Sequence, residues 1–328
     1  MKILYVDLQY DYGKKERGLN QIGEFGFHQV FKKLGHDVVC FYYDDYLSRL
    51  DDLQTHLLNF ADQESPDLIY FCLYTDQFRI ETLQKLKAKY RTINWFGDDQ
   101  WRFENFTSKY ATSFTYVITT DFFSLPKYQK LGCQNIFLSQ WAALNRTEVE
   151  LPDQSYLYDV SFVGGYNSIR HWFMDELKKL GISVSAFGFG WPLGPVSLER
   201  MDEIFRRSRI NLNLSNSNSF DIRYFLHHYK NSLRALRSSK SASQIKARNF
   251  EIPYYGGFQL TDYVPTLEKY FKIGQEIVCY ANIDEAAQLI HYYLQNETAR
   301  EEIKRASIQR ARQEHSYLHR LQDILSQL

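Results

Sequence analysis

The hydrophobic positions of this chain fall into short apolar runs separated by longer amphipathic stretches. An apolar run at 3–8 is followed by a polar loop at 10–18, a helical pattern at 22–34 and a second apolar run at 38–43. Gly35 marks the end of the helical pattern, as glycine often does after a helix. A buried strand, a helix and a second buried strand form a βαβ unit, which predicts a parallel sheet.

The same alternation continues along the whole chain. In the first half we expect further strands at 67–73, 92–96, 116–119 and 136–138, and helices at 46–63, 77–89, 103–110 and 125–131. In the second half we expect strands at 160–163, 184–187, 210–214, 258–260 and 277–280, and helices at 170–180, 198–207, 244–254, 283–294, 298–312 and 317–328. Strands that alternate with helices in this way are typical of doubly wound α/β domains.

A polar stretch at 144–155, which contains Pro152, interrupts this alternation and predicts an interdomain linker. The chain of 328 residues also favours two domains over one. We therefore expect two Rossmann-like α/β domains facing each other across a cleft. The predicted boundaries are 1–146 for the N-terminal domain and 147–312 for the C-terminal domain, with a helix at 313–328 packing back on the N-terminal domain.

Charge argues against a protein that binds nucleic acid through its overall field, because 39 basic residues balance 39 acidic ones. The segment 216–243 is an exception, since it is polar and basic with interleaved aromatic residues. It fits either a nucleic-acid patch or a solvated loop beside the cleft, and the neutral remainder of the chain favours the loop. The aromatic content of 16% fits core packing first and carbohydrate or base stacking second.

The four cysteines lie far apart and form no CxxC motif, which predicts reduced core thiols and a cytoplasmic location. The chain opens on a strand-like run instead of a signal-peptide pattern, and no apolar run approaches the ~20 residues of a membrane span. The acidic pairs Asp44-Asp45 and Asp98-Asp99 lack the ligand set of a complete metal site. We expect no metal, no cofactor and no transmembrane segment.

The stretch 246–262 carries the most informative chemistry. It places Glu251 between two cations, Lys246 and Arg248, and a Pro-Tyr-Tyr-Gly-Gly turn that leads into the apolar run 258–260. Cations and helix N-terminal amides suit phosphate, and a carboxylate accepts hydrogen bonds from ribose hydroxyls. The pattern favours a nucleotide-diphosphate ligand.

Several longer motifs resemble the CgeB-like family of glycosyltransferases. They are FVGGYNSIR (162–170), FGFGW (187–191), INLNLS (210–215), KARNFEIPYYGGFQLTDY (246–263), LEKYFKIGQEIVCY (267–280) and HSYLHR (315–320) in the second half, with RGLNQIGEFGFHQVFKKLGHDV and NWFGDDQWRF in the first. The resemblance implies the GT-B fold and a kinship with retaining enzymes of the family 4 type. It also implies a donor site mainly in the second domain, an acceptor site mainly in the first, and no dissociable metal in catalysis.

The resemblance also implies roles for individual residues of the second half. Glu251 matches the second glutamate of a paired motif and would hold the donor ribose, whereas Ser243 stands where the first glutamate belongs. Amides around Gln244 to Lys246 would cap the diphosphate at a helix start. The other expected donor-binding residues are Gly164, Gly165, Arg170, Gly188, Trp191, Asn213, Ser215, Lys246 and Arg248. The alternatives are a packing role for Trp191, a surface ion pair for Arg248 and an ordinary helix-start acid in Glu251.

On the acceptor side, the resemblance singles out Gly18, Asp98, Asp99 and Trp101. A carboxylate of Asp98 or Asp99 would orient an acceptor hydroxyl or support positive charge at the anomeric carbon, and plain loop capping explains these acids equally well. With Arg170 and Lys246 they form the expected catalytic set.

The expected function is transfer of a sugar from a UDP- or GDP-sugar to a hydroxyl of a glycan, protein or small molecule, with retention and without a metal. A non-catalytic sugar-nucleotide-binding or scaffold protein is the alternative, because Ser243 replaces a glutamate. A nucleic-acid-binding protein is a third interpretation.

Overall fold

A computed structural model describes residues 1–146, 155–215, 221–227 and 242–328. The chain divides into two compact units, Met1–Arg146 with Tyr317–Leu328, and Thr147–Ser316. Each unit is built around its own parallel sheet, which confirms the expected pair of Rossmann-like α/β units. The linker region expected at 144–155 and the basic segment at 216–243 lie largely outside the described residues.

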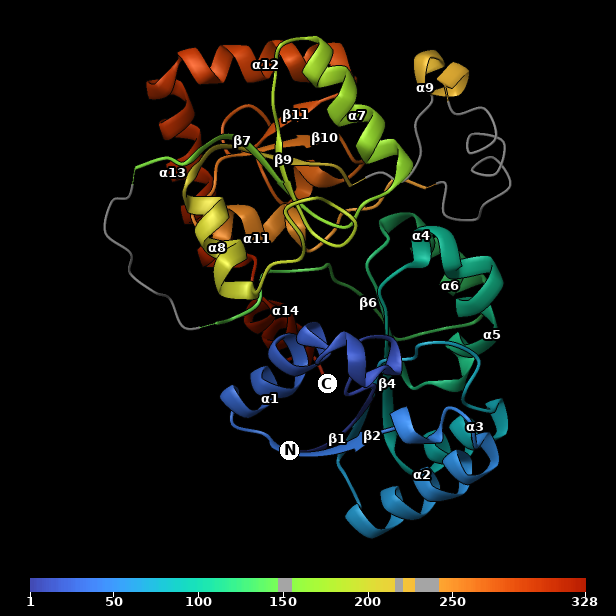
Figure 1. Cartoon of the computed structure of the whole chain (residues 1–328). Coiled ribbons are helices and arrows are strands. Elements are labelled where there is room, and N and C mark those ends of the chain that lie inside the picture. The colour runs from blue at the N-terminus through green and yellow to red at the C-terminus, as the bar shows by residue number, and fades with distance from the viewer. Residues whose placement is uncertain (147–154, 216–220, 228–241) are drawn as a thin grey trace. The chain divides into compact units, whose positions relative to one another are not determined.

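The first unit has a six-stranded sheet in the order β2-β1-β3-β4-β5-β6 (Figure 1). Its strands are β1 (Lys2–Asp7), β2 (Asp37–Tyr42), β3 (Leu68–Phe71), β4 (Arg91–Phe96), β5 (Tyr116–Thr119) and β6 (Ile136–Leu138). Its helices are α1 (Gln29–Lys33), α2 (Leu50–Glu64), α3 (Ile80–Lys89), α4 (Asp99–Arg102), α5 (Ser108–Tyr110), α6 (Leu125–Lys130) and α14 (Tyr317–Leu325). Two π-helical stretches, Ile22–His28 and Phe103–Thr107, continue into α1 and α5.

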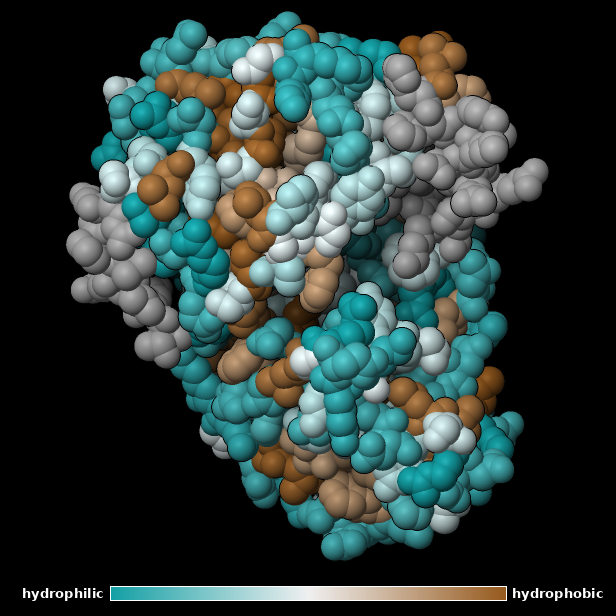
Figure 2. Space-filling view, viewed as in Figure 1, coloured by the Kyte–Doolittle hydropathy of each residue, from teal (hydrophilic) through white to brown (hydrophobic). Residues whose placement is uncertain are grey.

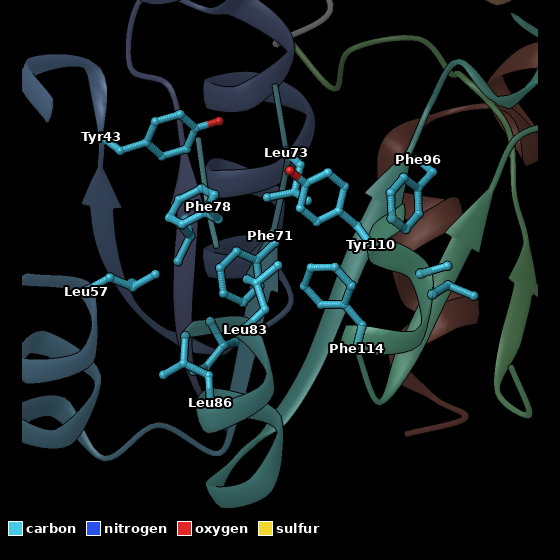
Figure 3. Close-up of a cluster of buried hydrophobic side chains, with 14 of the residues drawn as sticks. Tyr43, Leu57, Phe71, Leu73, Phe78, Leu83, Leu86, Phe96, Tyr110 and Phe114 are labelled. Atoms are coloured by element: carbon cyan, nitrogen blue, oxygen red, sulfur yellow. The ribbon is translucent and has the colours of Figure 1, made fainter. Parts of the chain in front are cut away.

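Aromatic side chains fill the core between this sheet and its helices. Phe71 of β3 meets Phe78 and Phe114 edge-on at centroid distances of 5.9 and 5.4 Å, and Tyr43 meets Phe78 at 5.1 Å (Figure 3). These residues are at most 3% exposed. Much of the high aromatic content therefore serves packing, as the first interpretation of the composition expects.

The C-terminal helix α14 belongs to the first unit although it is last in the chain. Its first residue, Tyr317, is fully buried and meets Phe27 edge-on at 5.3 Å. Gly26 leaves room for this ring, because a Cβ there would lie 3.1 Å from a Tyr317 ring carbon. A main-chain hydrogen bond also links the start of α14 to the end of the stretch Met1–Arg146, since Tyr317 N donates to Ala143 O at 3.1 Å.

The second unit has a five-stranded sheet in the order β11-β10-β9-β7-β8. Its strands are β7 (Tyr158–Val163), β8 (Ser185–Phe187), β9 (Ser208–Asn213), β10 (Gln259–Asp262) and β11 (Val278–Tyr280). Its helices are α7 (Ser168–Lys179), α8 (Leu198–Arg206), α9 (Ile222–His227), α11 (Arg248–Tyr254), α12 (Ile283–Gln295) and α13 (Glu297–Glu314). Figure 1 shows α7 and α12 on one side of this sheet and α8 and α11 on the other.

Two expected helices begin later in the chain than their patterns predict. Residues 46–49 form a separate turn before α2, which starts at Leu50, and α11 starts at Arg248 instead of 244. The remaining described elements lie within a few residues of their predicted bounds, as is usual because helix ends are the weakest part of a sequence pattern.

The short helix α9 is fixed on the second unit by Arg223 and Tyr224. Arg223 makes a two-pronged contact with Asp284, both at 3.0 Å, and Tyr224 OH lies 2.9 Å from Ser168 Oγ. The Tyr224 ring is buried against Trp172 at a centroid distance of 5.4 Å. On the outer side of the helix, Ile222 and Leu226 are both 71% exposed, and hydrophobic colour gathers there in Figure 2.

Candidate functional site

The strand order of the second unit defines one ligand-binding position in its sheet. The connections that leave β7 and β9 run in opposite directions, so the crevice outside their carboxyl ends is a topological switch point. Open parallel sheets bind ligands at such points. Here the strand ends are followed by Gly164-Gly165 after β7 and by Leu214-Ser215 after β9.

Arg170, in the first turn of α7, spans this switch point. Its Nη1 donates to Gly165 O at 2.7 Å and its Nη2 donates to Leu214 O at 3.0 Å. Across the described residues, no carboxylate pairs with this guanidinium and its buried Nε has no partner. Burial lowers the pKa of Arg170, and nearby Asp262 opposes that effect, so the side chain stays a cation. The arrangement holds a positive charge where the two strands end, and no carboxylate of the described residues contacts it directly.

Three residues expected to bind the donor instead pack against one another beside Arg170. Trp191 is 9% exposed and its Nε1 donates to Gly164 O at 2.9 Å. Gly188 has φ +131°, and a Cβ there would lie 2.3 Å from the same carbonyl oxygen. Trp191 therefore has the contacts of the packing alternative, and its expected role toward the donor stays a prediction. Gly165 differs, because it is exposed and no atom lies near its Cβ position.

A buried polar network joins the ends of β9 and β10. Asn213 Nδ2 donates to Thr261 Oγ1 at 3.2 Å, and Ser215 N donates to Asp262 Oδ1 at 2.8 Å. Ser215 Oγ donates to Asn249 Oδ1 at 3.2 Å. The two residues expected at the site, Asn213 and Ser215, are thus brought together and are about 4% exposed.

Sequence analysis missed the other three members of this network, Asn249, Thr261 and Asp262. The signal was present, because Thr261-Asp262 directly follows a buried apolar run and so marks the carboxyl end of a strand. Asn249 lies in the predicted motif between Arg248 and Glu251. Nothing in the sequence around it indicated that its side-chain amide would be buried in a polar network.

The late start of α11 changes the setting of the expected phosphate cap. Residues 244–246 precede the helix as irregular chain. Lys246 N donates to Asn249 Oδ1 at 3.0 Å, so this amide is already bonded, and Lys246 Nζ donates to Gln244 Oε1. The phosphate-binding role expected for 244–246 stays a prediction.

Arg248 and Glu251 form an ion pair with each other. Arg248 Nη1 lies 2.7 Å from Glu251 Oε2, and the two side chains are 25% and 9% exposed. The ion-pair alternative for Arg248 is therefore present in this structure. Ser243 is exposed and supplies no carboxylate beside this pair.

The adjacent acids of the first unit lie in different environments. Asp99 is 1% exposed and accepts hydrogen bonds from Thr107 Oγ1, Thr119 Oγ1 and Tyr128 OH at 2.6, 2.5 and 2.7 Å. Burial raises its pKa to about 6. A carboxylate enclosed by three hydroxyls has the internal bonding of the loop-capping alternative, and the expected catalytic role of Asp99 stays a prediction.

Asp98, Trp101 and Gly18 stay at the carboxyl edge of the first sheet. Asp98 precedes α4 and its carbonyl oxygen accepts from Trp101 N at 3.1 Å, with both residues half-buried. Gly18 closes the loop after β1, where its oxygen accepts from Asp11 N at 3.0 Å. These three residues keep an accessible position, and their roles remain proposals.

Within the described ranges, no cluster of three His, Cys, Asp or Glu side chains is arranged to hold a metal ion. No described helix is both long enough and apolar enough to span a bilayer.

Residues 170–326 match a family model described as glycosyl transferase-like. The match covers just under half of the chain and begins at Arg170, the residue that spans the switch point. The second half of the chain is thus similar to a glycosyltransferase-like domain. The chain is an enzyme, and its two parallel-sheet units are those of the GT-B fold.

Solved structures support this fold over the whole length of the chain. A glycosyltransferase from Rickettsia africae superposes with a TM-score of 0.61 at 11% identity, covering 99% of this chain and 97% of that one. HepE from Anabaena in complex with UDP gives 0.58 at 13% identity with full coverage of both chains. The DNA-modifying enzyme β-glucosyltransferase gives 0.56 at 12% identity, covering 100% and 99%. No curated protein sequence matches the chain.

Proposed function

We propose that this glycosyltransferase moves a sugar from a nucleotide-diphosphate sugar, with UDP or GDP as the leaving group, to an acceptor hydroxyl. The observation that carries the proposal is Arg170, whose guanidinium is bound by two strand-end carbonyls and by no carboxylate in the described part of the chain. A diphosphate at the β7/β9 switch point would supply the missing anion.

The second support is the helix that follows β7. The twelve-residue helix α7 starts at the same carboxyl edge and is capped by Asn167, whose Oδ1 accepts from Arg170 N at 2.9 Å. The N-terminus of a helix favours an anion through its free N–H groups and its dipole. Helix and guanidinium together would neutralise the charge that develops on the leaving diphosphate, which lowers the barrier to transfer.

The similar solved structures favour the same class of donor, a nucleotide-diphosphate sugar. HepE binds UDP, and a second HepE structure holds UDP and glucose. The β-glucosyltransferase was solved with and without uridine diphosphoglucose. These facts belong to those proteins, and they support UDP-sugars as the first donors to test here.

The remaining parts of the proposal rest on the sequence. We propose that the protein belongs to the CgeB-like family, retains the anomeric configuration, needs no metal for catalysis and is cytoplasmic. We further propose that Lys246, Asp98 and Trp101 take part at the donor and acceptor sides. Glu251 would bind the ribose when a donor displaces it from Arg248.

Isothermal titration calorimetry with UDP, GDP, ADP, CDP and TDP tests the donor site. We expect one nucleotide to bind and the Arg170→Ala variant to lose about 10- to 100-fold in affinity, the worth of one or two charge-assisted hydrogen bonds. Arg209→Ala is the matched control, because Arg209 lies at the start of β9 and pairs with exposed Asp159. Equal losses in the two variants would contradict the assignment.

Turnover separates transfer from binding alone. Incubation of the cognate nucleotide sugar with acceptor should release the nucleoside diphosphate, and NMR of the product shows whether the anomeric configuration is retained. Unchanged rates in EDTA support metal independence. Binding without release or transfer would favour the non-catalytic alternative that Ser243 raised.

A further inference from the structure

The first unit has its own switch point, between β1 and β3. These strands are neighbours in the order β2-β1-β3, with Val6 paired to Phe71, and their connections diverge at the carboxyl edge. The loop after β1 carries Tyr12 and the loop after β3 carries Tyr74. The two rings meet there with centroids 5.8 Å apart and planes at 76°.

Tyr12 is held in a conformation that side chains rarely adopt. Its φ and ψ are 54° and 26°, in the left-handed region, and the side chain is 55% exposed. A tyrosine in this region costs free energy that glycine would not, and such residues cluster at functional sites. More than half of the Tyr12 side chain is exposed, so its contacts with Tyr74 and Arg17 leave ring surface open, which points to a use for the ring itself.

The surrounding loop is built to keep Tyr12 in place. Asp44 at the end of β2 accepts from Gln9 N and Tyr10 N at 2.7 and 3.0 Å. Across the loop, Asp11 N donates to Gly18 O at 3.0 Å, and Asn20 N donates to Gln9 O at 2.9 Å. These bonds close the loop at its base and midway, so the tip that carries Tyr12 is preorganised.

Cations and a further aromatic residue flank the tyrosine pair. The Arg17 guanidinium lies 4.7 Å from the Tyr12 ring centroid and pairs with Asp11 at 2.7 Å. Arg102 Nη2 donates to Tyr74 O at 2.8 Å, and Arg102 Cζ lies 5.6 Å from the ring centroid of half-buried Trp101. Three neighbouring strand ends, those of β1, β3 and β4, thus bring aromatic surface and hydrogen-bond donors to one place.

We propose that Tyr12 and Tyr74 form a platform that binds a saccharide ring of the acceptor. The proposal rests on the proposed function and deepens it, since it names the acceptor class as a carbohydrate. A sugar ring has one apolar face of C–H groups, which packs on an aromatic ring, and a rim of hydroxyls, which pair with donors such as Arg17.

The geometry favours a single sugar ring over a polynucleotide or an apolar peptide. The two tyrosine planes are steeply inclined and Arg17 covers one face of Tyr12, so successive bases cannot stack in a row. The Arg17–Asp11 ion pair lies against the Tyr12 ring, and an apolar peptide side chain would leave these charged groups without partners.

Saturation-transfer NMR on the full chain, without donor, tests the platform with the methyl glycosides of glucose, galactose, mannose and N-acetylglucosamine. We expect at least one glycoside to receive magnetisation on its ring protons. The variants Tyr12→Gly and Tyr74→Ala should weaken that binding about tenfold, the worth of one stacking contact.

Tyr12→Gly is informative because it removes strain at a positive φ, so loss of folding does not explain a loss of binding. Ser65→Gly is the matched control, since Ser65 has φ 46° and ends α2 away from this loop. The platform is overturned if no glycoside binds, or if Tyr12→Gly binds as wild type does. UDP affinity, which Tyr12→Gly should leave unchanged, reports separately on the proposed donor site.

Discussion

Arg248 Nη1 lies 2.7 Å from Glu251 Oε2, which makes one ion pair of two residues that the motif assigns to phosphate and ribose. A donor phosphate would have to draw Arg248 away from a nearly buried carboxylate, at a cost in free energy. Arg170 has no such competitor in the described residues, because its partners there are main-chain carbonyls. The two arginines therefore differ in how much of their charge is available.

This difference predicts that Arg248→Ala weakens UDP binding less than Arg170→Ala, while it costs more stability. Removing Arg248 leaves Glu251 unpaired at 9% exposure, and we expect the free energy of unfolding to fall by about 1–3 kcal/mol. Glu251→Gln is the companion variant, and it should cost less because Arg248 reaches solvent. Calorimetry and urea denaturation measure both quantities. A UDP affinity that falls equally in both arginine variants would refute the distinction.

Asp7 predicts a pH dependence of stability. Burial raises its pKa from 3.8 to about 7, although Tyr5 OH and Leu8 N donate to it at 2.5 and 2.7 Å. The folded state therefore holds a proton that the unfolded state has released, and Asp7 costs stability as pH rises from 3.8 to about 7. The loss is at most about 4 kcal/mol.

The variant Asp7→Asn isolates this contribution. Its free energy of unfolding, relative to wild type, should rise across the pH range from 3.8 to about 7 and stay level above it. Asp99→Asn should show the same rise only up to about pH 6, where the pKa of Asp99 lies. Urea denaturation at several pH values gives both curves, and a flat difference for Asp7→Asn would show that its carboxyl is ionised throughout.

The fold was predictable because its determinants are local. Apolar runs such as 116–119 and 136–138 coincide with β5 and β6, since a buried parallel strand needs a continuous apolar stretch. Which acid of a pair enters the core was not predictable. Asp98 and Asp99 are chemically identical in sequence, and only the hydroxyls brought from Thr119 and Tyr128 decide that Asp99 is the buried one.

The candidate site was predictable to a similar degree. Its place at strand ends follows from the glycines that come after apolar runs. The role of Arg170 came from the family resemblance and stays a prediction. The pairing of Arg248 with Glu251 depends on where α11 starts, and a helix boundary is poorly defined by pattern. The strain at Tyr12 left no trace in the sequence, because tyrosine is not a residue that favours positive φ.

The close packing of Gly188 against Gly164, beside Arg170, predicts that a side chain at position 188 destabilises the protein. A Cβ at this residue would lie 2.3 Å from Gly164 O, so Gly188→Ala must displace main chain at the end of β7. Gly181→Ala is the control, since Gly181 also has positive φ, +81°, but open space around it. We expect a loss of about 1 kcal/mol for Gly181→Ala and a loss of several kcal/mol for Gly188→Ala. Similar losses in the two variants would mean that the main chain around Gly164 adjusts to the added methyl group at little cost.

Because α14 packs on the first unit, a change near the C-terminus should destabilise that unit selectively. Tyr317 is fully buried beside Phe27 and Trp95, so Tyr317→Ala opens a cavity there and should cost about 3–5 kcal/mol, as large aromatic deletions do. Tyr317→Phe keeps the ring and is the control, with an expected loss below about 1.5 kcal/mol. Hydrogen exchange resolves the two units: protection should fall in β1 and β4 of the Tyr317→Ala variant and persist in β9 and β10. Equal loss of protection in all four strands would show that the two units unfold as one.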